Sequence, residues 1–455
     1  MALVEQRGIP TVSLVSGGFQ EAWRRSAAAF GLATLPMVVI PRVITNQPSA
    51  DIEAMVDASM EELLSSLLEP AEVGPSPGAE GPASQAETID IQGDDLLDAF
   101  HRMNGLFLEY EWSDGLPLVP PAPELVERMI KGTSRDAQEV IATLEPTFGL
   151  ATVEKIAINA AMAGCKPEHL PVLIAAVQAI ASPPFMMRDA AVSTGSRSPL
   201  LVINGPIAKR LGLNSGACAL GPGAPSYANT VIGRAMRLIY MNIAGCYAGK
   251  TDPNTTGLPT KYSLCLAENE EASPWDPYHV EMGFDRDAST VTVKTVYGCT
   301  ETHDNKSTAP EMLADLGVEA ARYIGSAGIA TWLLGGTADP GTKLEVNSQQ
   351  VWLVCPDHAR LIAGAGWSKQ DLKSYLYKHA TQPVKELLSR KEIVRDNAGN
   401  WTQNPELQWL ENYPDLQVPT ASSPESFIIV VAGGPGPRGV YFWGNEEAVT
   451  VPIDE

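Results

Sequence analysis

The sequence predicts an α/β protein with a small βαβ-type N-terminal domain and a larger mixed α/β domain that contains buried apolar helices. Short apolar runs that end in glycine, proline or polar residues alternate with helical patterns along the chain. Two segments, Val153–Ala163 and Pro167–Ala181, are hydrophobic on every face and are expected to be buried helices. Between residues 69 and 93 the composition changes to Pro, Gly, Ser, Ala and Glu, which is typical of a flexible linker.

The small domain is assigned to residues 1–68, because apolar runs and helical patterns alternate there. An apolar run, Thr11–Val15, ends at Ser16-Gly17-Gly18, and a helical pattern over Phe19–Phe30 leads to a second run, Leu35–Ile40. A helix over Ser49–Leu68 completes this domain, since its apolar residues recur near the helical period. The linker then spans residues 69–93, and residues 94–455 form the large domain that is expected to be catalytic.

Strands in the large domain are expected where apolar runs end in polar or glycine-rich segments. They are Pro199–Ile203, Thr290–Val296, Val351–Cys355 and Ile428–Ala432. Residues 297–305, which include Cys299, Glu301 and His303, are expected to form a polar loop, and Met312–Leu334 is expected to be mostly helical. Because ligands of α/β sheets lie beyond the carboxyl ends of strands, the polar segments that follow these strands are candidates for a site.

Composition excludes several classes of protein. The net charge of −22, from 32 basic and 54 acidic side chains, opposes nucleic-acid phosphates and anionic membrane surfaces. The N-terminus lacks a secretory signal, and prolines interrupt the longest uncharged run, Leu170–Met187, so we expect no membrane span. The six cysteines occur singly, which favours reduced thiols in the cytoplasm. We expect a cytoplasmic homo-oligomer that binds a small molecule.

An acidic loop, Leu264–Phe284, is the stretch with the densest polar chemistry. It contains Glu268, Glu270, Glu271, Asp276, His279 and Glu281. Pro274 and Pro277 prevent one continuous helix, and Trp275 and Tyr278 supply apolar walls. Glu270, Glu271 and His279 are therefore candidates for acid–base catalysis, and His169, Glu271 and His279 for binding a divalent metal ion. A solvated acidic loop is the alternative.

Cys165 is the thiol with the most distinctive local sequence. Gly164 suits the left-handed residue that ends one helix, and Pro167 suits the first turn of the next, so Cys165 precedes a helix N-terminus. Lys166 and His169 add positive charge, and such surroundings lower a thiol pKa and make the thiol nucleophilic or metal-binding. The alternative is a small buried cysteine that fills a helix junction.

A glycine-rich loop over residues 213–223 precedes a helix that begins near Asn229. Its backbone N–H groups suit an anion, with Arg234 and Arg237 nearby, although plain turn glycines are the favoured explanation of the pattern. Neither a P-loop nor a G-x-G-x-x-G fingerprint occurs, so no nucleotide cofactor is predicted. The predicted substrate-binding residues are Asn204, Asn214, Ser215, Gly216, Trp275 and Arg234.

Several long segments together resemble a known family. In the N-terminal domain these are Arg7-Gly-Ile-Pro-Thr-Val-Ser-Leu-Val and Leu35-Pro-Met-Val-Val-Ile-Pro41; in the large domain they are Trp112-Ser-Asp-Gly-Leu-Pro-Leu-Val-Pro-Pro121, Val153-Glu-Lys-Ile-Ala-Ile-Asn-Ala, Ala163-Gly-Cys-Lys-Pro-Glu168, Asn204-Gly-Pro206, Asn214-Ser-Gly216, Glu268-Asn-Glu-Glu-Ala-Ser-Pro-Trp275, Gly366-Trp-Ser-Lys369 and Val431-Ala-Gly-Gly434. The first group resembles the small domain of the bacterial UGSC-like proteins, named for a Sec/Cys-Gly-Ser-Cys motif, and the second resembles their larger companion.

The resemblance implies a thiol-dependent bacterial enzyme, but the sequence departs from the family's own motif. No Cys-Gly-Ser-Cys occurs, and the corresponding βα turn reads Val15-Ser16-Gly17-Gly18. Thiol chemistry would then use Cys165, a substrate thiol or a thiol-bearing partner subunit.

Three functions remain open from the sequence. The first is an oxidoreductase or lyase, with redox or carbon–sulfur chemistry, in which Cys165 lies beside Glu270, Glu271 and His279. The second is a non-catalytic scaffold for a thiol-bearing partner. The third is a metal-dependent hydrolase or lyase that uses His169, His279, His303 and carboxylates, although no HExxH or CxxC spacing supports it. The cofactor is unknown, with a divalent metal as the candidate.

Overall fold

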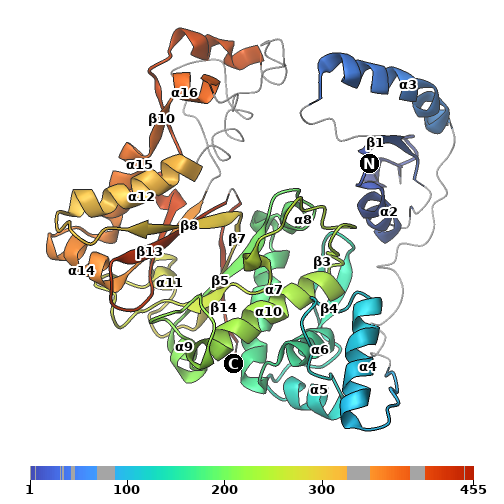
Figure 1. Cartoon of the computed structure of the whole chain (residues 1–455), viewed down its shortest axis with the longest axis horizontal. Helices are drawn as coiled ribbons and strands as arrows, with labels where there is room; N and C mark the ends of the chain where they lie inside the picture. Colours follow the sequence, from blue (N-terminus) through green and yellow to red (C-terminus); the bar gives the residue numbers. More distant parts are fainter. Residues whose placement is uncertain are drawn as a thin grey trace. The chain divides into compact units, whose positions relative to one another are not determined.

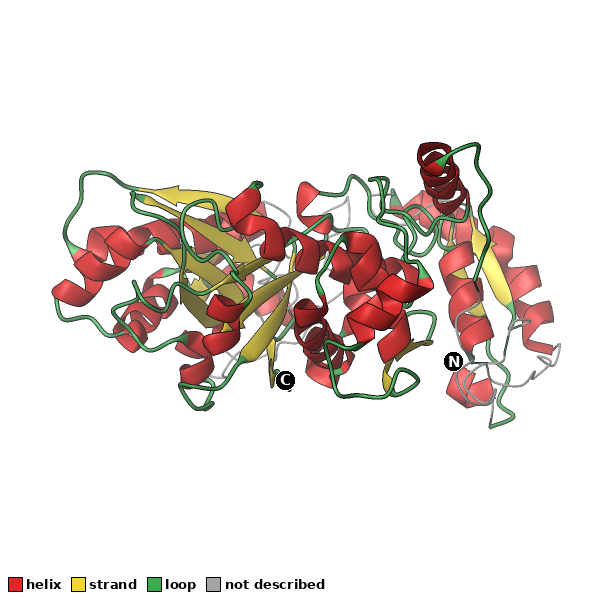
Figure 2. Ribbon diagram, turned by 90° about the horizontal axis from the view of Figure 1, so that it is seen from below, coloured by secondary structure: helices red, strands yellow, loops and turns green. Residues whose placement is uncertain are grey.

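The computed structural model describes most of the 455 residues. The described residues are 2–5, 7–30, 32, 35–41, 47–68, 88–324, 349–389, 405–444 and 446–454. Helices and strands are mixed along the chain (Figure 2), so the predicted α/β class is confirmed.

The chain divides into two compact units. Unit 1 consists of residues 1–181, 186–196 and 235–257, and unit 2 of residues 182–185, 197–234 and 258–455. Residues 94–455, which were predicted as one large domain, therefore contribute to both units. Residues 69–87 of the predicted linker lie outside the described residues.

The first part of unit 1 has the predicted βαβ order (Figure 1). Strands β1 (Ser13–Ser16) and β2 (Met37–Ile40) pair in parallel, with α2 (Gln20–Ala29) between them in the chain and α3 (Ser49–Leu68) after them; α1 (Ala2–Glu5) precedes β1. The indole Nε1 of Trp23 on α2 donates to Ser13 Oγ on β1 at 2.7 Å. Because Leu32 and Leu35 pack with Ala27, α2 and the segment after it share one small core.

The rest of unit 1 is mainly helical. It contains α4 (Leu96–Glu109), α5 (Pro123–Ile130), the antiparallel pair β3 (Val140–Leu144) and β4 (Gly149–Thr152), α6 (Val153–Ala163), α7 (Leu170–Ala181), α8 (Met187–Ala191) and the last part of α10 (Tyr227–Asn242). Thr152 caps α6, since its side chain accepts from Lys155 N at 3.2 Å. Most residues of α6 and α7 are buried, as their apolar character on every face predicts.

No single helix in the described ranges is long and apolar enough to cross a membrane. One pair of helices, Pro167–Ala181 and Pro183–Ala191, has the length and composition of a span but is bent by 75°.

Two four-stranded sheets form the centre of unit 2. The first sheet has the strand order β14-β7-β5-β6 and the second β12-β9-β13-β8. Their strands are β5 (Ser198–Asn204), β6 (Cys265–Ala267), β7 (Thr290–Val296), β8 (Gly298–His303), β9 (Gln350–Val354), β12 (Phe427–Val431), β13 (Arg438–Trp443) and β14 (Val449–Pro452). Pairing is parallel between β5 and β6 and between β12 and β9, and antiparallel elsewhere in both sheets.

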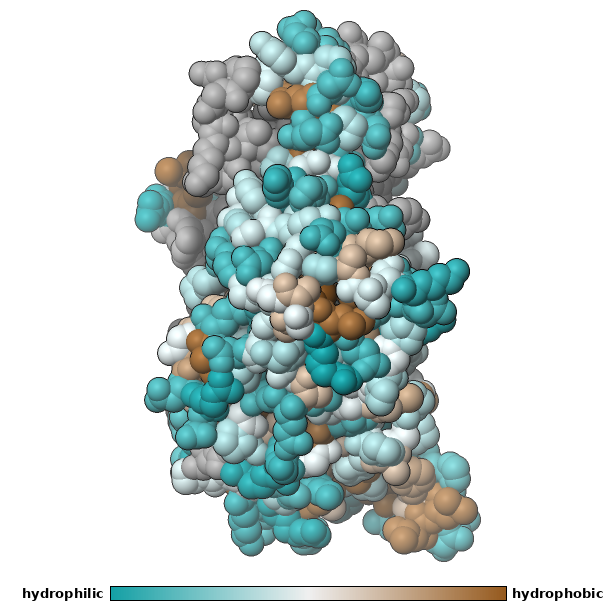
Figure 3. All heavy atoms as spheres, turned by 90° about the vertical axis from the view of Figure 1, so that its left-hand side faces the viewer, coloured by the Kyte–Doolittle hydropathy of each residue, from teal (hydrophilic) through white to brown (hydrophobic). Residues whose placement is uncertain are grey.

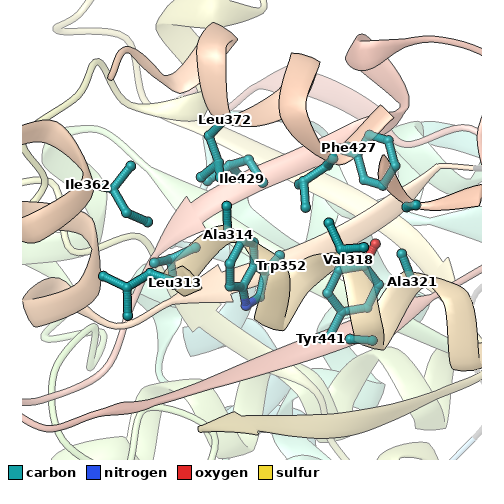
Figure 4. Close-up of a cluster of buried hydrophobic side chains, with 14 of the residues drawn as sticks. Leu313, Ala314, Val318, Ala321, Trp352, Ile362, Leu372, Phe427, Ile429 and Tyr441 are labelled. Atoms are coloured by element: carbon teal, nitrogen blue, oxygen red, sulfur yellow. The ribbon is translucent and has the colours of Figure 1, made fainter. Parts of the chain in front are cut away.

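Strands β9 and β12 are buried on both faces, which explains their uninterrupted apolar sequences. On one face, Trp352 and Ile429 pack with residues of α12 (Pro310–Ile324) and α15 (Lys369–His379), as Figure 4 shows. On the other face, Leu353 and Val430 pack with residues of the first sheet such as Leu200. Successive side chains of a strand point to opposite faces of its sheet, so alternate residues of β9 and β12 pack in two different cores.

One expected loop is wrong. Residues 297–305 were predicted as a polar loop, but Gly298–His303 form strand β8, which pairs antiparallel with β13. Strand β8 is at the edge of its sheet, and the side chains of Cys299 and Glu301 are exposed. Because the strand is only partly buried, its sequence has no apolar run that would predict it. The predicted helix over residues 312–334 begins earlier, at Pro310, and residues 325–334 lie outside the described ranges.

Shorter elements complete unit 2. They are α9 (Pro206–Arg210), α11 (Tyr278–Glu281), α14 (Pro356–Gly364), α16 (Val384–Ser389) and the antiparallel pair β10 (Thr381–Pro383) and β11 (Gln417–Pro419). On the face that Figure 3 presents, hydrophilic residues predominate and apolar ones form small separate groups.

Candidate functional site

Polar side chains gather in unit 2 at the carboxyl ends of β5, β6 and β12. Asn204 is the last residue of β5, and Glu268 directly follows β6, the parallel neighbour of β5. The chain after β12 reaches the same edge, because Asn269 N donates to Val431 O at 2.8 Å. The site therefore lies where ligands of α/β sheets are expected, beyond the carboxyl ends of parallel strands.

Asn204 joins two glutamates of the acidic loop. Its Nδ2 donates to Glu268 Oε2 at 2.7 Å and to Glu270 Oε1 at 3.0 Å, and its side chain is fully buried. Because ionised carboxylates only accept hydrogen bonds, the amide nitrogen must face them. The amide oxygen, Asn204 Oδ1, then has no hydrogen-bond partner among the described residues.

Glu270 is held by one of its two carboxylate oxygens. Oε1 accepts from Asn204 Nδ2 and from Gly205 N, the latter at 2.7 Å. Gly205 has φ +83°, ψ −171°, a conformation essentially restricted to glycine, and this backbone geometry presents its N–H to the carboxylate. Oε2 makes no hydrogen bond within the described ranges, and the Glu270 side chain is 27% exposed. One oxygen thus fixes the group while the other remains available.

His279 lies beside Glu270 and is completely buried. Its Nε2 is 3.1 Å from Arg286 O, and because a carbonyl only accepts, Nε2 must carry a proton. Nδ1 of the neutral ring is then a bare acceptor. It is 3.9 Å from Glu270 Oε1 and has no hydrogen-bond partner in the described part of the chain. The imidazole and the carboxylate are thus neighbours, but no hydrogen bond joins them.

Glu268 is the buried carboxylate of the site. Burial raises its pKa above the ordinary value, an effect that the nearby Lys369 ammonium and the N–H of Tyr278 partly oppose. Tyr278 N donates to Oε2 at 2.8 Å, whereas Lys369 Nζ is 4.0 Å from Oε1. Oε1 has no hydrogen-bond partner among the residues that the structure describes. Glu268 thus retains a proton to higher pH than an exposed glutamate does.

Two buried lysines of α15 hold the acidic loop. Lys369 Nζ donates to Asp276 O at 2.7 Å and is 3.5 Å from Glu281 Oε2, while Lys373 pairs with Glu281 Oε1. Burial lowers the pKa of Lys373 to about 8 and also lowers that of Lys369. The loop is therefore ordered by internal contacts with α15, which the composition of residues 264–284 alone does not predict.

Glu271 takes no part in this arrangement. Its carboxylate pairs with Lys209 Nζ at 2.9 Å, and both side chains are more than four-fifths exposed. Of the predicted metal ligands, His169 belongs to unit 1 and Glu271 and His279 to unit 2, so this metal site remains a prediction. No group of three or more His, Cys, Asp or Glu side chains in the described ranges is arranged to hold a metal ion.

The other predicted substrate-binding residues have mainly structural contacts. Asn214 holds its own loop: Oδ1 accepts from Gly216 N at 2.9 Å, and Nδ2 donates to Ala217 O and Ser226 Oγ, both at 2.9 Å. Ser215 O accepts from Gly433 N at 2.8 Å, which brings this loop to the segment after β12. Trp275 Nε1 donates to Trp367 O at 3.0 Å, and Arg234 is half-buried on α10. Of the predicted set, Asn204 has the direct contacts with the carboxylates.

Sequence reasoning placed Glu268 in the acidic loop but did not select it as a site residue, and it missed Lys369 as a functional residue. Glu268 has a usable signal, since it follows the three-residue buried strand Cys265–Ala267. Lys369 belongs to the resembling segment Gly366-Trp-Ser-Lys369, but its local position, as the first residue of α15 after the N-cap Ser368, does not indicate a role in the site. Its approach to Glu268 depends on tertiary packing.

Cys165 lies in unit 1, at the helix junction that its flanking residues predict. Gly164 is left-handed, with φ 88°, and Pro167 begins a 3₁₀ turn that leads directly into α7. The thiol is buried. The acidic loop belongs to unit 2, so a site shared by Cys165 and His279 remains a prediction.

His169, four residues after Cys165, makes the folded state sensitive to acid. Burial lowers its pKa from 6.5 to about 4. Between these values the unfolded chain binds a proton that the folded chain does not, so stability falls as the pH drops from 6.5 to 4, by up to about 3 kcal/mol. Urea denaturation at several pH values measures this loss. His169→Asn, whose Oδ1 replaces Nδ1 as acceptor for Lys166 N, is expected to remove it.

The exposed His101 on α4 supplies the matched control for this experiment. His101→Asn is expected to leave the pH dependence of the wild type unchanged. An equally steep loss of stability in His169→Asn would show that another group is responsible.

Comparison with known proteins identifies the N-terminal part of the chain. Residues 2–69 match the model of the UGSC family. No curated protein and no solved structure matches the chain. The matched segment contains β1, α2, β2 and α3, the elements whose order predicted a small βαβ domain. Residues 2–69 are therefore a UGSC-like N-terminal domain.

Proposed function

We propose that the chain is an enzyme that acts on a small organic molecule by acid–base catalysis, with Glu270 as the group that accepts the proton. The observation that carries this proposal is the geometry of Glu270. Two N–H donors hold Oε1, while Oε2 is unbonded within the described residues and the side chain is partly exposed. A general base must be fixed and must reach its substrate, and these contacts support both, because Glu270 is held through Oε1 and its Oε2 is left for a ligand.

His279 and Glu268 support this role in different ways. His279 Nδ1 is 3.9 Å from Glu270 Oε1, which is close enough for a protonated ring to stabilise the carboxylate by its charge. Glu268, with its raised pKa, is suited to return a proton to a leaving group. Glu270 would remove a proton from the substrate, and Glu268 would protonate the leaving group. This division of roles is typical of a lyase, which is the reaction class that we favour.

Hydrogen exchange with solvent provides a test that does not require the substrate to be known in advance. The full chain is incubated in D₂O with a panel of small amines, amino acids, hydroxy acids and thiols, and deuterium incorporation or elimination is measured by mass spectrometry. Glu270→Gln is expected to lower the rate on any active compound by about 10²–10⁴-fold, because it removes the base while retaining the shape of the side chain.

Glu271→Gln is the matched control, since Glu271 is the adjacent glutamate and pairs with Lys209 at the surface. This variant is expected to keep full activity. Undiminished exchange by Glu270→Gln would refute the proposal. Cys165→Ser in the same assay tests whether a thiol takes part, and unchanged turnover would remove Cys165 from the mechanism.

A further inference from the structure

The polar atoms of the site that lack a partner are all hydrogen-bond acceptors. Three of them, Asn204 Oδ1, Glu268 Oε1 and His279 Nδ1, are buried and unpaired within the described part of the chain. The fourth is Glu270 Oε2, which belongs to the partly exposed carboxylate. Buried polar groups are normally paired, so several unpaired acceptors in one cluster indicate a site that is completed by a ligand.

Contacts of 4 Å or less join the four side chains. Asn204 Nδ2 is within hydrogen-bond distance of both glutamates, and Glu270 Oε1 is 3.9 Å from His279 Nδ1. The unpaired atoms therefore belong to one cluster of side chains and not to separate places in the core. A group that pairs with them must supply N–H or O–H donors, because Asn204 Oδ1, Glu270 Oε2 and His279 Nδ1 only accept in the assigned state, and Glu268 Oε1 accepts when that carboxyl is ionised.

The charge of the cluster is also incompletely balanced. Glu270 contributes one carboxylate and Glu268 a second one when it has given up its proton, and the nearest ammonium, Lys369 Nζ, is 4.0 Å from Glu268 Oε1. That ammonium already donates to Asp276 O and lies 3.5 Å from Glu281. The net charge of −22 on the whole chain adds an attraction for cations at longer range. Both the missing donors and the missing charge are supplied by a small cation.

We propose that this site binds the protonated amine or amidinium group of its substrate, an inference that rests on the function proposed for Glu270. An organic cation suits the cluster because its N–H groups pair with several acceptors at once. Binding there places the atoms next to the cationic group beside Glu270 Oε2. The substrate class is thus a small organic cation, with the reacting proton close to its nitrogen.

Three probes of nearly equal shape separate the chemical classes. Acetamidinium, acetamide and acetate are titrated into the full chain at constant ionic strength, and binding is followed by ligand-observed NMR. Acetamidinium is expected to bind saturably, acetamide about tenfold or more weakly, which corresponds to about 1.4 kcal/mol, and acetate not at all. Tighter binding of acetate, or no selectivity among the three, would overturn the inference.

Variants locate the bound cation. Glu270→Gln and Glu268→Gln are each expected to weaken acetamidinium binding by about tenfold or more, since charge-assisted hydrogen bonds are lost, whereas Glu271→Gln should not. Circular dichroism is used to check that each variant is folded. If Glu268→Gln does not fold, Glu270→Gln alone decides the test, because Glu270 is partly exposed. A metal ion is the alternative ligand. If Zn²⁺ or Mg²⁺ binds stoichiometrically, displaces acetamidinium and no longer binds to Glu270→Gln, the acceptors hold a metal ion and the inference is overturned.

The outcomes also separate this inference from the proposed function. Selective binding of acetamidinium without any Glu270-dependent hydrogen exchange would support the cation site and contradict the catalytic role. Glu270-dependent exchange on neutral or anionic compounds, without selective binding of acetamidinium, would support the enzyme and contradict the substrate class.

Discussion

Replacing Glu446 with glutamine is expected to lower the free energy of unfolding by about 3–5 kcal/mol, because it leaves buried positive charge without its carboxylate. The Glu446 side chain is 4% exposed and pairs with Arg197, which is 19% exposed. Tyr297 OH donates to Glu446 Oε1 at 2.8 Å, and the Arg197 guanidinium lies 4.6 Å from the centre of the Tyr297 ring. Lys294 is also fully buried nearby, and burial lowers its pKa to about 8 although Glu446 opposes the shift.

Urea denaturation followed by tryptophan fluorescence measures the effect. Asp415→Asn is the control, because its pair with Lys385 is exposed at both ends and such pairs contribute little to stability. Adding Lys294→Met to Glu446→Gln should recover part of the lost stability, since it removes one of the buried cations. Equal losses for Glu446→Gln and Asp415→Asn would show that the buried charges are already compensated in another way.

A methyl group added at Gly205 is expected to damage both stability and the site. The backbone of Gly205 has φ +83°, and an added Cβ would lie 2.1 Å from Ala288 O and 2.8 Å from Ala288 C. Because the obstacle is backbone, the chain must move, and the strained conformation alone costs about 1–3 kcal/mol. The Gly205 N–H that holds Glu270 Oε1 moves with it. Gly205→Ala is therefore expected to lose more than about 2 kcal/mol of stability and most Glu270-dependent activity.

Gly364→Ala is the matched control within unit 2. Gly364 is the last residue of α14, and an added Cβ would have no atom within 4 Å. The change is expected to be neutral or to stabilise the protein by about 0.5–1 kcal/mol, because alanine favours the helix. Thermal unfolding and acetamidinium titration are measured for both variants. A Gly205→Ala protein with wild-type stability and wild-type affinity would contradict the proposed role of the Asn204–Gly205 turn.

Several elements were predictable because their signals are local. The prediction for β7 agrees with the structure, and those for β5, β9 and β12 differ by one residue at each end. Each of these runs is buried, so hydrophobicity marks it whatever its partner is. Helix α6 and the junction at Gly164 and Pro167 were predictable for the same reason, since capping depends on neighbouring residues. Strand β8 was missed because an edge strand needs no apolar run.

The sequence by itself determined the α/β class, the UGSC-like character of residues 2–69, and the acidic loop as the place with the densest polar chemistry. Only the tertiary structure decided which carboxylates of that loop work together. It joined Glu268 and Glu270 through Asn204, turned Glu271 to the surface, and brought Lys369 within 4.0 Å of Glu268. The physical reason is that these contacts connect residues about 60 to 100 positions apart, where strand pairing and helix packing, and not local propensity, set the distance between side chains.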